Sequence, residues 1–193
     1  RLHRLIGIPS SPVTRETDQA TLAHKWFYEG SAEFTSTYRR FIAEVVEPFV
    51  GGPVVFQRVP TFRVQLPSNL AVGEFHRDRN YGHPDEAINL WVALTEAADS
   101  TAVWFRGPYV HSQNVYAAAP DSAVGEVLVF DGVNLEHGNI PNSTGLTRVS
   151  FDFRVIPKEK FVPRPDAASI NTHLPFTIGP NAYYDVLSDE ERR

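Results

Sequence analysis

The distribution of apolar side chains divides the chain into a helical N-terminal part and a longer part typical of β-strands. Over Ser31–Val50, apolar residues recur every three or four positions, which is the spacing of one face of an α-helix. Pro48 and Gly51-Gly52 predict the end of this helix. The preceding segment, Thr14–Glu29, also permits a helix, with Thr14 or Thr17 as candidate N-caps. The apolar stripe of the longer helix comprises Phe34, Tyr38, Phe41, Ile42, Val45 and Val46.

After residue 52 the pattern changes to short runs of β-branched and aromatic residues, separated by Pro, Gly, Asn and Asp. Eight such runs at this spacing predict a mainly β domain, a sandwich or jelly roll, with the N-terminal helices packed on one sheet. The predicted strands are Val54–Val59, Phe62–Leu66, Leu70–Arg77, Ala87–Leu94, Ala102–Arg106, Val110–Ala117, Glu126–Phe130 and Thr147–Ile156.

The last predicted strand, Thr147–Ile156, alternates strictly between apolar and polar side chains. Its polar positions are Arg148, Ser150, Asp152 and Arg154. This pattern is typical of a half-exposed strand with its polar side in solvent. The alternative is that the polar side faces the inside of a cup-shaped sandwich while the apolar side packs under the helices. The position of the strand shortly after His137 favours the second interpretation.

The length of 193 residues suits one domain with a substantial core. We expect a single domain over residues 1–193, with a helical part at about 14–50, a β core at about 53–157 and an extended tail at 158–193. The tail contains several prolines and no periodic pattern, so the sequence predicts no place for it on the β core.

Composition narrows the range of partners. A net charge of −5 provides no basic footprint for nucleic acid, and the absence of cysteine excludes disulfides and thiolate metal sites. No apolar run reaches membrane-spanning length, and Arg1-Leu2-His3-Arg4 is not followed by a signal-peptide core. Because the sequence begins at Arg1, we expect a trimmed product. These features favour a cytoplasmic protein with no nucleic-acid or membrane partner.

The segment Glu74-Phe75-His76-Arg77-Asp78 carries the strongest chemical signal. On an extended strand, the side chains of His76 and Asp78 leave the same face. An imidazole and a carboxylate side by side are two of the three ligands of the facial 2-His-1-carboxylate site of non-haem Fe(II) oxygenases. His137 is the candidate third ligand, and the neighbouring Gly138 lets backbone approach the metal region closely.

A basic and a hydroxyl residue follow on the last predicted strand. Arg148 lies eleven residues after His137, and Ser150 lies two positions further on the same face. An arginine can hold a carboxylate with two hydrogen bonds, as the distal carboxylate of a 2-oxoglutarate cosubstrate would need.

This ordered set, His76-x-Asp78, His137 and Arg148-x-Ser150, resembles the Fe(II)/2-oxoglutarate-dependent dioxygenases. Between Phe62 and Pro157 the amino-acid sequence is most similar to that of the StrG-type oxygenases of antibiotic pathways. Examples are Tyr81-Gly82-His83-Pro84 and Phe130-Asp131-Gly132. The resemblance implies a double-stranded β-helix with Fe(II), 2-oxoglutarate and O2 as cofactors. It also implies oxidation of a small polar natural-product intermediate, such as an aminocyclitol, amino sugar or nucleoside.

Further polar and aromatic residues share faces with this set. We expect Gln65 and Asn89 to help hold the cosubstrate, and Arg63 and Trp91 to line the substrate cavity. Glu74 either faces that cavity or pairs with an inward arginine such as Arg63 or Arg154.

Other candidates have structural interpretations. His83 and His111 are expected at the surface or in structural hydrogen bonds, and Trp104 is expected in the core.

Two other function classes compete with an oxygenase. One is a non-oxidative cupin-like isomerase or binding module, which has no need of a carboxylate clamp such as Arg148-x-Ser150. The other is a halogenase of the same fold, which normally lacks the carboxylate ligand that Asp78 would provide.

Overall fold

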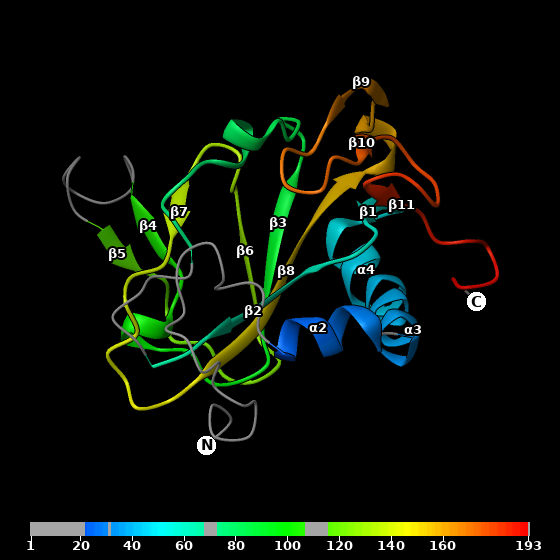
Figure 1. Ribbon diagram of the computed structural model, residues 1–193. Helices are drawn as coiled ribbons and strands as arrows, with labels where there is room; N and C mark the ends of the chain where they lie inside the picture. Colours follow the sequence, from blue (N-terminus) through cyan, green and yellow to red (C-terminus); the bar gives the residue numbers. More distant parts are fainter. Residues whose placement is uncertain (1–21, 31, 68–72, 107–115, 193) are drawn as a thin grey trace.

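The computed structural model describes residues 22–30, 32–67, 73–106 and 116–192. Within these ranges the protein is mainly β, with a few helices at the N-terminal side packed beside antiparallel sheets (Figure 1). The helical elements are α2 (Leu22–Glu29), α3 (Ala32–Phe41), the π-helix η1 (Ile42–Val46) and α4 (Glu47–Val50). The helix expected from Thr14 is thus described only from Leu22 onward.

The helix expected over residues 31–50 forms, but it is interrupted. A π-helical segment, η1, separates α3 from α4. Pro48 lies in the first turn of α4, where its missing N–H leaves no hydrogen bond unmade, so it does not end the helix as we expected. Gly51 ends it instead, with a left-handed φ of 89° and its N–H donated to the carbonyl of Glu47.

Three antiparallel sheets follow the helices. The largest has the strand order β11-β1-β8-β3-β6, with β2 also paired to β8, and a second sheet has the order β5-β4-β7. The third is a two-stranded pair of β9 and β10. The strands are β1 (Val54–Gln57), β2 (Thr61–Gln65), β3 (Ile88–Ala93), β4 (Trp104–Arg106), β5 (Tyr116–Ala118), β6 (Val127–Phe130), β7 (Glu136–Gly138), β8 (Arg148–Pro157), β9 (Arg164–Ala168), β10 (Pro175–Phe176) and β11 (Tyr184–Asp185).

Two strand predictions need correction. The described part of Leu70–Arg77 forms only a single β-bridge at His76, and a short 3-10 helix, η2 (Asp78–Tyr81), follows at once. The sequence did not predict β7, because a three-residue strand is too short to show an alternating pattern. Most of the predicted strand Val110–Ala117 lies outside the described residues.

The C-terminal tail is folded onto the β core. Its last strand, β11, pairs antiparallel with β1, and β9 and β10 pair with each other. Phe176 and Tyr184 are buried in a second apolar cluster with Val55 and Ile156 of the large sheet. These apolar contacts attach the tail to one end of the sheet (Figure 1).

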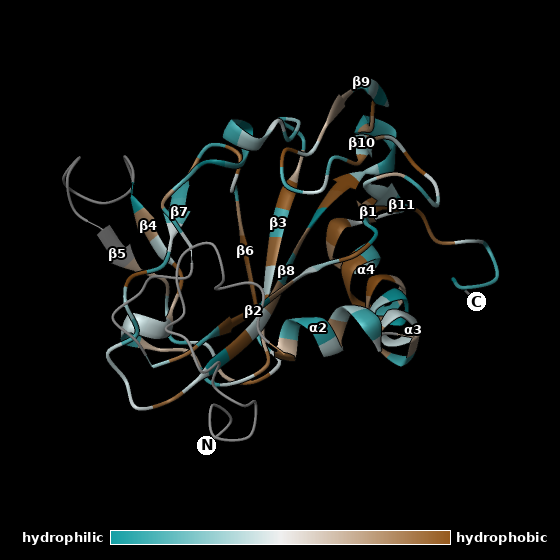
Figure 2. Ribbon diagram, viewed as in Figure 1, coloured by the Kyte–Doolittle hydropathy of each residue, from teal (hydrophilic) through white to brown (hydrophobic). Residues whose placement is uncertain are grey.

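The main core lies between the helices and the apolar face of β8. Phe151, Phe153 and Val155 pack against Tyr38 and other side chains of α3 and η1. Hydropathy colouring shows the apolar stretch of β8 beside α4 (Figure 2). The expectation that the helices cover one sheet is therefore confirmed.

The opposite face of β8 is polar and buried. Arg148, Ser150, Asp152 and Arg154 are each at most 6% exposed. Because these side chains point into the protein, the inward-facing interpretation of the alternation is confirmed. None of the helices in the described part of the chain is long and apolar enough to cross a membrane.

Candidate functional site

The two histidines of the predicted ligand set face each other across a β-bridge. The backbone N–H of His76 donates to the carbonyl of His137, and the reverse bond also forms, each at 2.9 Å. A Cβ on Gly138 would lie 2.9 Å from the backbone of Phe75. Only glycine therefore allows this approach, as the sequence predicted.

Asp78 reaches the same place through a turn rather than along a strand. Arg77 is extended, with φ −112° and ψ 141°, and Asp78 begins the 3-10 helix η2. The backbone N–H of Asp78 donates to the carbonyl of Gly132 at 2.8 Å, which attaches the turn to the loop before β7. The predicted proximity of His76 and Asp78 is correct, but the predicted strand geometry is not.

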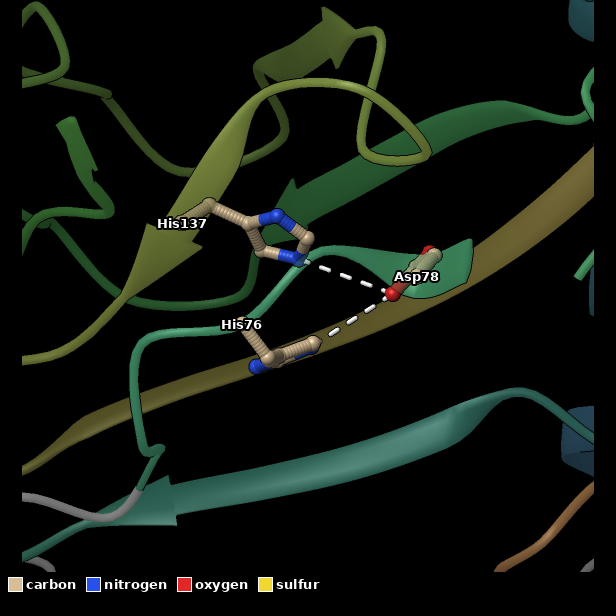
Figure 3. A group of neighbouring side chains, drawn as sticks. All are labelled: His76, Asp78 and His137. Carbon is tan, nitrogen blue, oxygen red and sulfur yellow. Dashed lines mark ion pairs between the residues drawn. The ribbon is translucent and has the colours of Figure 1, made fainter. Parts of the chain in front are cut away.

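The three side chains converge on one point (Figure 3). One ligand atom from each of His76, Asp78 and His137 lies within 4.8 Å of the others. Asp78 Oδ1 is 3.4 Å from His76 Nε2 and 3.8 Å from His137 Nε2. Among the described residues, this is the group whose geometry could hold a metal ion.

Backbone carbonyls orient both imidazoles. His76 Nδ1 lies 2.7 Å from the carbonyl oxygen of Glu74, and His137 Nδ1 lies 2.9 Å from that of Leu135. Each carbonyl accepts a hydrogen bond from Nδ1–H. In the neutral ring this places the lone pair on Nε2, which faces Asp78. Burial lowers the pKa of His137 to about 4, so this ring is neutral and able to bind a cation.

Asp78 is fully buried and held on both oxygens. Arg154 Nε donates to Oδ2 at 2.7 Å and Arg154 Nη2 to Oδ1 at 3.0 Å, while Asn89 Nδ2 donates to Oδ2 at 2.6 Å. Burial opposes ionisation of this carboxyl, but the positive charge of Arg154 and its hydrogen bonds outweigh this effect and hold the pKa of Asp78 well below its usual range. Asp78 is therefore an ionised carboxylate held in one orientation, and its oxygen could bind a metal ion.

Arg154 belongs to a buried chain of alternating charges that the sequence prediction missed. Arg154 Nη1 lies 3.4 Å from Asp152 Oδ2, and Arg63 Nε donates to Asp152 Oδ1. These ion pairs connect Asp78 to the sheet through Arg154 and Asp152. The polar alternation of β8 was the signal in the sequence, since it placed both residues on the inward face.

Arg148 is surrounded by neutral acceptors. It is 1% exposed and donates to Ser150 Oγ at 2.7 Å, Gln65 Oε1 at 3.0 Å and the carbonyl of Thr101 at 3.2 Å. No carboxylate of the described residues lies within ion-pair distance of it. Burial, with a smaller contribution from Arg63, lowers the pKa of Arg148 to about 9. A buried guanidinium without an anion is a costly arrangement unless a ligand provides one.

A small cavity of about 30 Å³ lies beside two of the candidate ligands, His76 and His137. Arg63, Asn89 and Trp91 line it. Asn89, which we expected to help hold the cosubstrate, donates its described hydrogen bond to Asp78. Gln65 does not line it and instead bonds the guanidinium of Arg148, which lies 5.5 Å from the ring centre of Trp91.

A larger cavity of about 590 Å³ opens on the other side of His76. Glu74 and Arg63 contribute to its walls, and residues of the C-terminal tail close one side. Arg63 forms an ion pair with Asp152, and Arg154 forms one with Asp78. Glu74 lies in the wall of this cavity, which is one of the two positions expected for it.

The remaining predicted residues have different outcomes. His83 was expected at the surface or in a structural hydrogen bond. It is instead 7% exposed, lines the larger cavity and has no hydrogen-bond partner at Nδ1. Trp104 is only partly buried and donates from Nε1 to the carbonyl of Asp99. His111 lies outside the described residues.

No family model matches the chain. The sequence is 40% identical over 174 residues to the streptomycin biosynthesis protein StrG of Streptomyces griseus, covering 90% of this chain and 80% of that protein.

Solved structures share the fold at low sequence identity. The 2-oxoglutarate-dependent epimerase SnoN of nogalamycin biosynthesis matches at 15% identity and a TM-score of 0.55, over 83% of this chain and 75% of that chain. The non-haem monooxygenase ThoJ, in a nickel complex, matches at 18% identity and a TM-score of 0.50, over 80% and 75%. SnoN has also been solved with Fe3+ and α-ketoglutarate.

Proposed function

This chain belongs to the family of the streptomycin biosynthesis protein StrG, and on that premise we propose that it is an Fe(II)- and 2-oxoglutarate-dependent oxygenase. Its substrate would be a small polar natural-product intermediate, such as an aminocyclitol, amino sugar or nucleoside. We also propose that residues 1–193 form one domain whose sheets are the two sides of a double-stranded β-helix. The likeness in fold to SnoN and ThoJ supports this architecture.

The donor set fits Fe(II). Two neutral imidazole nitrogens and one carboxylate oxygen, all on one side of the site, are the ligands that non-haem Fe(II) oxygenases use. His76, Asp78 and His137 would hold the metal, and the carbonyls of Glu74 and Leu135 would fix the two rings. Bound Fe(II), with 2-oxoglutarate and O2, would supply the oxidising equivalents that remove hydrogen from the substrate and yield succinate and CO2.

The observation that carries the cosubstrate proposal is the environment of Arg148. This guanidinium is almost completely buried, and its described hydrogen-bond partners are all neutral. A dicarboxylate whose proximal end binds the metal would bring its distal carboxylate to this face of β8. Arg148 would bind that carboxylate with two charge-assisted hydrogen bonds, and Ser150 would add a hydroxyl donor.

Binding requires some movement of side chains. The 30 Å³ cavity beside His76 and His137 is much smaller than 2-oxoglutarate. Trp91 lines this cavity, and its ring centre lies 5.5 Å from the guanidinium of Arg148, so a shift of this ring would open the cavity towards Arg148. Closure of the ring over the bound carboxylate would then exclude water from the clamp.

Two observations weigh against the competing function classes. A non-oxidative metal-binding module has no use for a buried arginine without an anion, such as Arg148. A halogenase needs an open position where a carboxylate would bind the metal, whereas Asp78, which is held on both oxygens, would occupy that position in this protein.

The proposed function predicts slow consumption of 2-oxoglutarate even without a substrate. Protein supplied with Fe(II), ascorbate and 2-oxoglutarate in air should release succinate and consume O2 in equal amounts. Succinate can be quantified by chromatography, with protein reconstituted with Zn2+ as the inactive control. A protein that binds Fe(II) but releases no succinate with any candidate substrate would instead be a non-oxidative metal-binding module.

A further inference from the structure

The larger cavity has the size and position of a small-molecule site. Its volume of about 590 Å³ lies within the roughly 300–1,000 Å³ typical of ligand pockets, and His76 forms part of its wall. The walls come from the turn between β1 and β2, from segment 73–83, from the end of β8 and from the C-terminal tail. It can therefore hold a substituted ring next to the candidate metal centre.

The charges on its wall disfavour an anionic ligand. Two arginines, Arg63 and Arg154, are among the described lining residues, and both are paired with carboxylates, Asp152 and Asp78. No lysine lines the described wall. A carboxylate or phosphate entering this space would find no unpaired cation among the described lining residues. Hydroxyl and ammonium groups need no such cation.

One polar side chain on the wall has hydrogen-bonding capacity that the fold does not use. The imidazole of His83 is 93% buried between Phe176 and Tyr183, with ring centres 5.2 Å apart in both cases. Its Nδ1 has no hydrogen-bond partner, and no described residue bonds Nε2. Buried polar groups are nearly always hydrogen-bonded, so this ring points to a missing ligand.

The position of His83 is fixed relative to the candidate metal ligands. Its backbone N–H donates to the carbonyl of Asp78 at 3.3 Å, after a turn in which Gly82 has a left-handed φ of 86°. A neutral imidazole offers one hydrogen-bond donor and one acceptor. A hydroxyl group, also both donor and acceptor, is its chemical complement.

We propose that the larger cavity binds a polyhydroxylated ring that is neutral or positively charged, and that His83 hydrogen-bonds one of its hydroxyl groups. This inference rests on the proposed function for the role of the cavity as the substrate site. It adds the charge class of the substrate and the residue that recognises it.

Four compounds of similar ring size separate the possibilities. Glucose, glucosamine and glucuronate share a pyranose ring and differ in charge, and cyclohexanol lacks the additional hydroxyl groups. Binding to the metal-free protein can be compared by saturation-transfer NMR. We expect glucose and glucosamine to bind at least tenfold more tightly than glucuronate and cyclohexanol.

Variants of His83 test the recognition residue. His83→Phe keeps an aromatic ring between Phe176 and Tyr183 but removes both nitrogens, so affinity for glucosamine should fall about five- to tenfold, the effect of one hydrogen bond. His173→Phe is the matched control, since His173 is exposed and does not line the cavity. If His83→Phe does not fold, the imidazole 15N resonances of His83 in the parent protein should shift when glucosamine is added.

Several results would overturn the inference. These are preferential binding of glucuronate or cyclohexanol, binding by none of the four compounds, and equal affinity of His83→Phe and parent. Unchanged His83 resonances in the presence of bound glucosamine would also contradict it. Because these measurements use metal-free protein, they are independent of succinate release, which tests the oxygenase proposal.

Discussion

Replacing Asp78 by asparagine is expected to weaken Fe(II) binding by more than about 100-fold and to abolish most succinate release. Loss of a partner that only supports a metal ligand already costs about 10- to 100-fold in affinity or activity, so loss of the anionic ligand itself should cost more. Asparagine keeps the shape of the side chain, whereas glycine would also leave a void beside Arg154. Fe(II) affinity can be measured anaerobically by competition with a chromogenic chelator.

Asp152→Asn is the matched control for this variant. Asp152 belongs to the same buried charge chain and also pairs with Arg154, but it is not one of the three candidate ligands. Both variants remove a carboxylate partner of Arg154, so both should lower the melting temperature, and Asp152→Asn should lower it at least as much because Asp152 also pairs with Arg63. Only Asp78→Asn should lose its affinity for Fe(II), and the Fe(II) affinity of Asp152→Asn should stay within about tenfold of that of the parent protein. Equal retention of iron in the two variants would place the carboxylate ligand elsewhere.

Replacing Arg148 by methionine should weaken 2-oxoglutarate binding by roughly 30- to 1,000-fold and leave Fe(II) binding nearly unchanged. A bidentate, charge-assisted hydrogen bond in a dry site is worth about 2–4 kcal/mol, which corresponds to this range. Methionine preserves the packing of the side chain over Trp91. Isothermal titration of the iron-loaded protein under anaerobic conditions gives the affinity.

The stability of Arg148→Met provides a second readout. Because Arg148 is buried without a carboxylate partner in the described structure, its removal should leave the melting temperature unchanged or raise it. Arg148→Lys should restore only part of the affinity, since an ammonium lacks the planar fork of a guanidinium. Parental affinity in Arg148→Met would mean that another cation, such as Arg63, holds the cosubstrate.

The sequence predicted those structural features that depend on a pattern among neighbouring residues. The alternation of β8 was sufficient to place Arg148 and Asp152 on an inward face, because period-two patterning maps directly onto the two sides of a strand. The glycine after His137 likewise predicted a close backbone approach, which Phe75 makes. The apolar stripe of the N-terminal helix predicted its packing on the sheet.

Features that depend on contacts between distant segments could not be predicted in the same way. The pairing of Arg154 with Asp78 joins residues 76 positions apart, and nothing near either residue indicates which partner it has. The burial of His83 depends on Phe176 and Tyr183 of the tail, for which the sequence shows no periodic pattern. The turn at Asp78 was missed because a carboxylate two residues after a histidine fits a strand equally well.

The most direct test of the account is the absorption spectrum of anaerobic protein titrated with Fe(II) and then with 2-oxoglutarate. If His76, Asp78 and His137 leave the metal open to a chelating cosubstrate, one equivalent of Fe(II) should bind. A weak visible charge-transfer band should then appear on addition of 2-oxoglutarate and be absent with succinate. Binding of one Fe(II) without this band would contradict the claim that the protein uses 2-oxoglutarate, and failure to bind Fe(II) would contradict the metal centre itself.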